Sequence, residues 1–166
     1  MIDILVNDIN TALENEAYLS ALSLVLTLPD VCGKAKYPNK KVGERYISWY
    51  DEYVGQYETY IGKTTPYLSG EVVYSLRNSF LHQATPDIDK DKISESQNKI
   101  DEFVLVIEPK KEIEIYADTT CVNADNKIYN VNIQRLCLII TKCALNYYND
   151  NKNLFDFIQY EIRYQK

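Results

Sequence analysis

Histidine, tryptophan and methionine each occur once in the 166 residues, and glycine and proline occur five times each. Few glycines and prolines together with 46% hydrophobic residues are typical of an ordered globular protein. The length fits a single domain over residues 1–166 with a sizeable core. No apolar run approaches the ~20 residues that a membrane-spanning helix needs. Residues 1–10 carry Asp3 and Asp8 in place of a basic region, so we expect no signal peptide and a cytoplasmic protein.

A single histidine also restricts metal chemistry. The cysteines are Cys32, Cys121, Cys137 and Cys143, and none of them has CxxC spacing. We therefore expect reduced thiols and no zinc site. The motifs GxGxxG, GKS/T, HExxH and GxSxG are absent, so no cofactor and no metal are expected. Positive charge is scarce as well, and the net charge of -6 argues against non-specific binding to duplex DNA.

The spacing of apolar residues predicts a mainly α-helical protein. Residues 2–28 carry apolar side chains three or four positions apart, which predicts one long helix or two abutting helices that end at Pro29 and Gly33. The same period predicts further helices over 42–61, 69–83, 132–149 and about 154–164. Ser69 and Asn132 are the predicted N-caps of two of them.

Residues 102–131 have strand character instead. The apolar run 103–107 and the alternating segment 113–117 predict a hairpin, and a further strand over 127–131 follows a turn at 124–126. We therefore expect a small antiparallel hairpin or sheet, at about 102–131, inserted into a helical bundle. The acidic segment 84–101 fits a solvated loop better than a lid or a metal site.

Two other stretches have a functional and a structural interpretation. Residues 34–45 run from Lys34 to Arg45 with five basic residues and one acidic residue. They could follow a nucleic-acid backbone, but a solvated loop that turns at Pro38-Asn39 is the interpretation we favour. Aromatic residues at helical spacing in 42–61 could stack on bases, but core packing explains that spacing as well, and we favour it.

One short polar set stands out within the predicted helix 69–83. Arg77 is followed at once by Asn78 and, five positions on, by His82. Such groups are costly to bury beside Leu76 and Phe80 unless they are paired or used. Five steps of an α-helix rotate the chain by about 140°, so we expect Arg77 and His82 to lie on different stripes. Pairing two copies of the helix about a two-fold axis would bring both residue types into one cleft.

This Arg-Asn-x3-His pattern in a mainly helical chain resembles the signature of the HEPN superfamily (higher eukaryotes and prokaryotes nucleotide-binding domain). The resemblance covers the motif and its helical setting, residues 1–83 and 132–166. It implies a bundle of four or five helices, a homodimer and a metal-independent endoribonuclease. It also implies that His82 is the general acid or base, that Arg77 binds the scissile phosphate and that Asn78 orients one of them.

Elementary chemistry supports the same residue types. Attack by an RNA 2′-hydroxyl on its own phosphate needs a proton acceptor and a fixed cation, and a guanidinium offers two parallel donors. The first hypothesis follows the HEPN resemblance, which implies an RNA-cleaving toxin or defence effector with an antitoxin or a nucleotidyltransferase as candidate partner. The alternative is a non-catalytic HEPN-like module that binds RNA, a nucleotide or a protein, in which the sheet offers a docking edge. A purely structural alternative also stands, in which Arg77 pairs with a carboxylate and His82 caps the helix end.

Overall fold

The computed structural model describes residues 1–57, 68–83, 85, 88–108, 117–123, 126–160 and 163, with the backbone alone for 117–123 and 126. These residues are mainly α-helical. The α-helices are α1 (Ile2–Glu14), α2 (Tyr18–Val25), α3 (Leu28–Lys36), α4 (Val42–Tyr53), α5 (Gly70–Asn78) and α6 (Ile133–Asp150). The strands are β1 (Glu102–Val106), β2 (Ala117–Asn123) and β3 (Asn126–Asn132). None of the helices in these ranges is long and apolar enough to cross a membrane.

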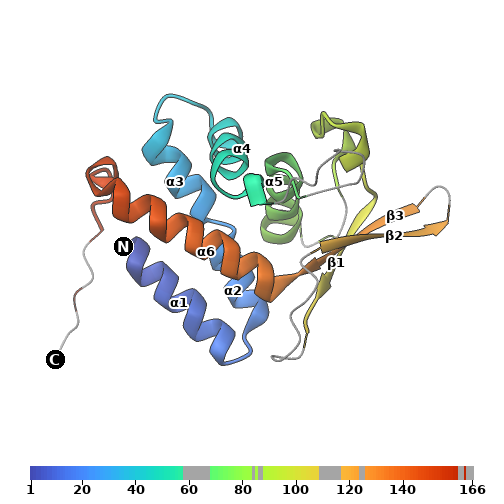
Figure 1. Cartoon of the computed structure of the whole chain (residues 1–166), viewed down its shortest axis with the longest axis horizontal. Helices are drawn as coiled ribbons and strands as arrows, with labels where there is room; N and C mark the ends of the chain where they lie inside the picture. The colour runs from blue at the N-terminus through green and yellow to red at the C-terminus, as the bar shows by residue number, and fades with distance from the viewer. Residues whose placement is uncertain are drawn as a thin grey trace.

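Helix α6 lies at the centre of the helical part (Figure 1), where it contacts α1, α2 and α3. Helix α4 packs on α3 and on α5, and α5 lies between the other helices and the sheet (Figure 1). The predicted aromatic stripe belongs to the core at Tyr46, Trp49 and Tyr50, which are all fully buried, whereas Tyr57, beyond the end of α4, is 68% exposed. The predicted helix over 42–61 ends at Tyr53, and residues 58–61 lie outside the described residues. Asn132 caps α6 as predicted, since its side-chain oxygen accepts a hydrogen bond from the Arg135 N–H at 2.9 Å.

The N-terminal region forms three helices. The prediction of two helices that end before Pro29 is confirmed by α1 and α2, but the prediction that Gly33 lies at a helix end is wrong, because α3 runs from Leu28 to Lys36. A turn at Glu16, whose φ is 59°, separates α1 from α2. Pro29 is the second residue of α3, in the first turn, where its missing N–H leaves no hydrogen bond unmade. Gly33 lies inside α3. The backbone of α4 comes so close that a Cβ at residue 33 would lie 2.6 Å from the Arg45 carbonyl oxygen, so the position requires glycine. Pro29 therefore lies at a helix start, and Gly33 lies at a close contact between two helices.

The three strands form one mixed sheet in the order β1-β3-β2. Strands β1 and β3 are parallel, with Phe103 opposite Tyr129. Strands β2 and β3 are antiparallel. The predicted antiparallel hairpin that starts at β1 is therefore wrong. Alternation of side chains identifies a strand but carries no information about its partner, and the chain between β1 and β3 is long enough to return in the parallel direction. Residues 113–116 lie outside the described residues.

Helix 154–164 is also a wrong prediction over its described part. The chain forms a short 3-10 turn, Lys152–Phe155, and residues 158–160 are irregular. Phe155 is buried against the rings of Tyr147 and Tyr148, whereas Tyr160 is 85% exposed. One anchored aromatic residue does not supply the apolar stripe that would hold a helix against the core.

Candidate functional site

The start of α5 is fixed firmly against α4. Ser69 caps the helix as predicted, with its hydroxyl oxygen accepting a hydrogen bond from the Val72 N–H at 3.4 Å. The Asp51 carboxylate on α4 accepts a second bond from the Gly70 N–H at 2.6 Å. A Cβ at Gly70 would lie only 2.7 Å from the Ile47 carbonyl oxygen. The position of α5, and of the motif it carries, is therefore set by α4.

Helix α5 does not continue as an α-helix to His82. It ends at Asn78, and Ser79–Gln83 form a π-helical turn. The Ser79 hydroxyl donates to the Ser75 carbonyl oxygen at 2.7 Å, a local bond that is known to bend helices. Hydrogen bonds of a π turn run from residue i to i+5, so residues five apart lie nearly above one another. The expectation from α-helical geometry that Arg77 and His82 lie on separate stripes is therefore wrong.

All three residues of the motif lie together. The Arg77 Nη1 atom donates to the Asn78 Oδ1 atom at 3.0 Å and lies 3.2 Å from the His82 Nε2 atom. Since a guanidinium has no acceptor, this contact is a hydrogen bond in the tautomer of His82 that carries its proton on Nδ1 and accepts at Nε2. Arg77 and Asn78 are half-buried, and His82 is exposed. The imidazole is thus accessible, while the guanidinium is partly enclosed.

No carboxylate pairs with Arg77 in the part of the chain that the structure describes. Other basic residues there do form ion pairs, namely Lys36 with Glu52, Arg45 with Asp30, Lys90 with Asp101 and Lys92 with Asp89. The Nε atom of Arg77 is buried and has no hydrogen-bond partner among these residues. The charge of Arg77 is therefore held by neutral groups, and within the described ranges no anion competes for it.

An aromatic neighbour of Arg77 was missed in the sequence. Tyr74 lies three residues before it on α5, and the guanidinium carbon is 5.9 Å from the centre of the Tyr74 ring. The signal was present, because residues three apart share a helix face and arginine favours contact with aromatic rings. Tyr74 also contacts the buried ring of Tyr46 on α4, with the ring centres 5.1 Å apart.

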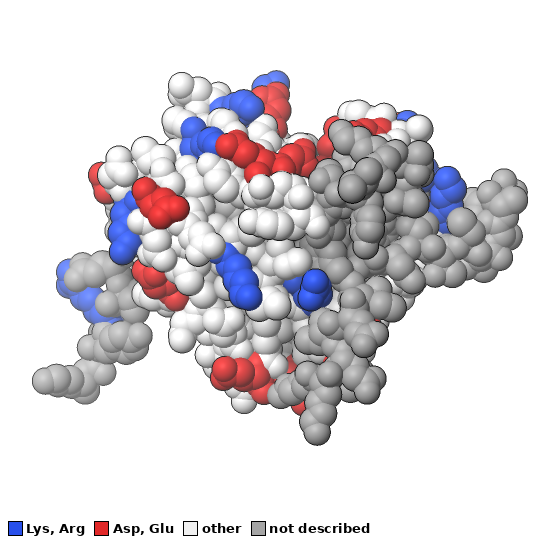
Figure 2. Space-filling model, in the orientation of Figure 1, with Lys and Arg blue, Asp and Glu red and all other residues white. Residues whose placement is uncertain are grey.

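The basic stretch 34–45 does not form a continuous basic track. Lys40 donates to the Ser48 hydroxyl at 2.9 Å, and Arg45 pairs with Asp30. On the face drawn in Figure 2, basic side chains near α3 and α4 sit directly beside acidic ones. The predicted turn at Pro38-Asn39 is confirmed by the Lys40 N–H, which donates to the Tyr37 carbonyl oxygen at 3.1 Å. Two of the five basic residues of this stretch, Lys36 and Arg45, are thus paired with carboxylates, which weakens the stretch as a phosphate-binding track.

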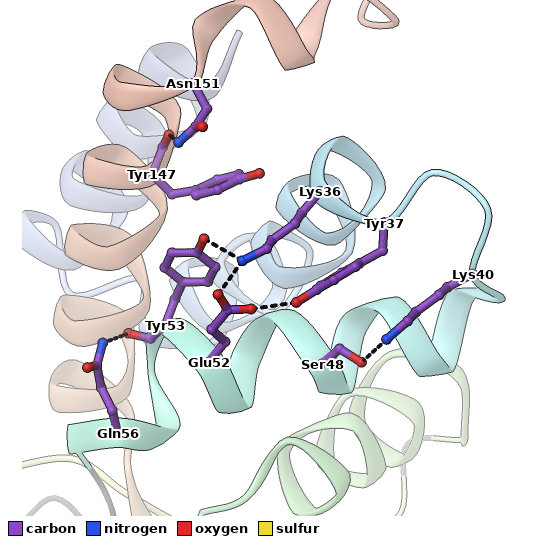
Figure 3. Close-up of polar contacts among 9 residues, drawn as sticks. All are labelled: Lys36, Tyr37, Lys40, Ser48, Glu52, Tyr53, Gln56, Tyr147 and Asn151. Atoms are coloured by element: carbon purple, nitrogen blue, oxygen red, sulfur yellow. Dashed lines mark hydrogen bonds and ion pairs between the residues drawn. The ribbon is translucent and has the colours of Figure 1, made fainter.

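A second polar cluster joins α3 to α4 (Figure 3). Lys36 pairs with Glu52 and donates to the Tyr53 hydroxyl at 2.8 Å, and Tyr37 donates to Glu52 at 2.5 Å. The hydrogen bond from Lys36 is the main cause that lowers the pKa of Glu52. Burial raises the pKa of the neighbouring Tyr147 to about 12. The members of this cluster satisfy one another, so we assign it a structural role in helix packing.

The described residues offer little to a metal ion or to thiol chemistry. No group of three or more His, Cys, Asp or Glu residues in the described ranges is arranged to hold a metal. Cys32 and Cys137 are buried free thiols, and Cys143 is half-buried. Burial raises the pKa of Cys137 to about 12, so this thiol stays protonated. The side chain of Cys121 lies outside the described part.

Comparison with protein-family models, with curated proteins and with solved structures found no match to this chain.

Proposed function

We propose that the protein is a metal-independent endoribonuclease that cleaves RNA with Arg77, Asn78 and His82, in a composite site formed where two copies of the chain meet. The observation that carries the proposal is the contact between Arg77 and His82 through the π-helical turn. This contact places a proton acceptor, the His82 imidazole, and a cation, the Arg77 guanidinium, close enough to act on the same phosphate. The resemblance of the Arg-Asn-x3-His pattern to the HEPN signature supports the same chemistry.

The proposed reaction is a transesterification within the RNA. A 2′-hydroxyl attacks the adjacent phosphorus, the bond from phosphorus to the 5′-oxygen breaks, and a 2′,3′-cyclic phosphate and a 5′-hydroxyl remain. His82 Nε2 carries the free electron pair that accepts the 2′-hydroxyl proton, and a protonated imidazole returns a proton to the leaving 5′-oxygen. Arg77 turns its N–H groups from His82 to the phosphate oxygens, whose negative charge grows in the transition state.

Asn78 acts on Arg77 in this scheme. Its Oδ1 atom holds one N–H of Arg77 Nη1 at 3.0 Å, which fixes the rotation of the guanidinium plane. The two-fold arrangement would place a second set of the same residues in the cleft, so that one copy serves as base and the other as acid. Isologous dimers are the commonest oligomers, and a dimer of this kind needs no further partner.

The experiment is RNA cleavage by the purified chain in EDTA, with a mixture of single-stranded RNAs and with analysis of the new ends. We expect cleavage that leaves 2′,3′-cyclic phosphates. His82→Ala should slow it about 10² to 10⁴-fold, the usual contribution of a general acid or base. Lys142→Gln removes one charge from an exposed position of α6 and serves as the matched control with unchanged cleavage.

Cleavage that continues in His82→Ala, or that requires a divalent ion, would refute the proposed mechanism. Sedimentation at working concentration tests the dimer separately. If the protein is a monomer and still cleaves RNA, the proposal of a composite dimer site is wrong, and one Arg77–His82 pair is sufficient for cleavage.

A second candidate function is a non-catalytic interaction module. The observation in its favour is that β1 is an outer strand of the sheet among the described residues and that its Val104 side chain is 40% exposed. Ile107, just beyond β1, is 51% exposed. Exposed apolar residues on an edge strand invite pairing with another chain. This candidate predicts no cleavage of any RNA, and loss of assembly in Val104→Lys with an unchanged far-UV spectrum.

A further inference from the structure

The packing around Arg77 has a third component besides Asn78 and His82. The Tyr74 ring lies 5.9 Å from the guanidinium carbon and leans on the buried Tyr46 ring with an interplanar angle of 53°. Tyr46 is fully buried in the close-packed core, so its ring forms a rigid packing surface for Tyr74. The Tyr74 ring is thereby held between α4 and the Arg77 guanidinium.

Gly43 on α4 makes room for this ring. A Cβ at residue 43 would lie 3.2 Å from Cε1 of Tyr74 and 3.3 Å from its Cζ and hydroxyl oxygen. Contacts this short require the ring to move by a few tenths of an ångström. The missing side chain of Gly43 therefore leaves the space that the Tyr74 ring occupies. The ring in turn limits the positions open to the Arg77 guanidinium.

We propose that Tyr74 is a positioning residue for Arg77, and that Gly43 seats Tyr74. This inference rests on the proposed function for its effect on catalysis, but its structural half stands on the α4–α5 packing alone. The negative face of an aromatic ring attracts a cation within about 6 Å of the ring centre, and the Arg77 guanidinium carbon lies 5.9 Å from the Tyr74 ring centre. The Tyr74 ring and Asn78 together confine the guanidinium beside His82, so that only the N–H groups facing His82 have to turn toward an arriving phosphate.

A set of variants distinguishes the effect of the aromatic ring at position 74 from the effect of an apolar side chain of similar size. Tyr74→Leu removes the ring and keeps an apolar side chain, while Tyr74→Phe keeps the ring and loses the hydroxyl. Gly43→Ala leaves the tyrosine intact and displaces it. Tyr148→Leu is the matched control, because Tyr148 on α6 lies under a different cation, with Lys152 Nζ 5.7 Å from its ring centre.

The first measurement is cleavage under single-turnover and steady-state conditions in EDTA. We expect Tyr74→Leu and Gly43→Ala to lower kcat roughly tenfold, the size of one cation–ring contact, with KM changed less than twofold. Tyr74→Phe should stay within about twofold of the wild-type kcat, since it keeps the ring. Equal loss in Tyr74→Phe, or the same loss in Tyr148→Leu, would overturn the positioning role.

The second measurement needs no RNA. The Nε–Hε signal of Arg77 in a ¹⁵N-edited spectrum, assigned by its loss in Arg77→Lys, reports the ring current of Tyr74. It should shift in Tyr74→Leu and Gly43→Ala and stay in place in Tyr74→Phe and Tyr148→Leu. A signal that does not move in Tyr74→Leu overturns the inference. If the wild type cuts no RNA, the proposed function fails, and the response of this signal to Gly43→Ala, which keeps the Tyr74 ring but displaces it, still decides whether Gly43 and Tyr74 set the position of the guanidinium.

Discussion

Arg77 Nη1 lies 3.2 Å from His82 Nε2, although five residues separate the two along the chain. An α-helix would turn these side chains about 140° apart. The π-helical turn Ser79–Gln83 brings them together, and π turns within helices are frequent at functional sites. The contact also occupies the lone pair of Nε2, so a phosphate that draws Arg77 away would free the same nitrogen as a base.

Arg77 should be irreplaceable by lysine. A lysine keeps the charge but loses the planar fork that fits two phosphate oxygens and the contact to Asn78 Oδ1. We expect Arg77→Lys to slow RNA cleavage roughly 10 to 100-fold and Arg77→Ala about 10² to 10³-fold, measured as single-turnover rates in EDTA. Full activity of Arg77→Lys would show that a point charge suffices and that the fork has no role.

Gly70 should tolerate no side chain, because α5 begins there against α4. A Cβ would lie 2.7 Å from the Ile47 carbonyl oxygen and 2.9 Å from the Ile47 Cα. We expect Gly70→Ala to lower the free energy of unfolding by about 1–3 kcal/mol in urea titrations, as overpacking does. Gly55→Ala is the matched control, because its nearest contact would be 3.4 Å and its cost should stay within about 0.5 kcal/mol. Equal costs in the two variants would contradict the packing of α5.

Glu52 should stabilise the fold at neutral pH and lose that contribution in acid. Hydrogen bonds from Lys36 and Tyr37 lower its pKa in the folded state. For a carboxyl group with a lowered folded pKa, the stabilisation is present above the unfolded pKa and lost as the pH falls through the folded one. Because Glu52 is 45% exposed, solvent screens the pair, and Glu52→Gln should cost only about 0.5 kcal/mol at pH 7. Urea titrations at pH 7 and pH 3 check this, and a cost that is larger at pH 3 would contradict the network.

The starts of α5 and α6 and the caps at those starts could be predicted from the sequence, for local reasons. Ser69 and Asn132 lie at helix starts and bond N–H groups within the same turn, so their role depends on neighbours in the chain alone. The buried stripe of Tyr46, Trp49 and Tyr50 follows from a 3.6-residue period.

Features that depend on contacts between distant segments were not predictable. Gly33 looks like a helix terminator in the sequence, and the Arg45 backbone that requires its missing side chain is twelve residues away. The parallel partner of β1 is likewise set by tertiary packing. The motif was found because Arg77 and His82 are rare polar residues in an apolar segment. Their contact was missed because nothing local distinguishes a π turn from an α-helical one.

A double-mutant cycle on Arg77 and His82 tests the central claim most directly. Single-turnover cleavage rates in EDTA are compared for the wild type, Arg77→Ala, His82→Ala and the double variant. If the two residues act as one unit on one phosphate, each single variant loses most of the activity and the double variant is little slower than the slower single one. Losses that multiply in the double variant, or a single variant that keeps the wild-type rate, would contradict the account.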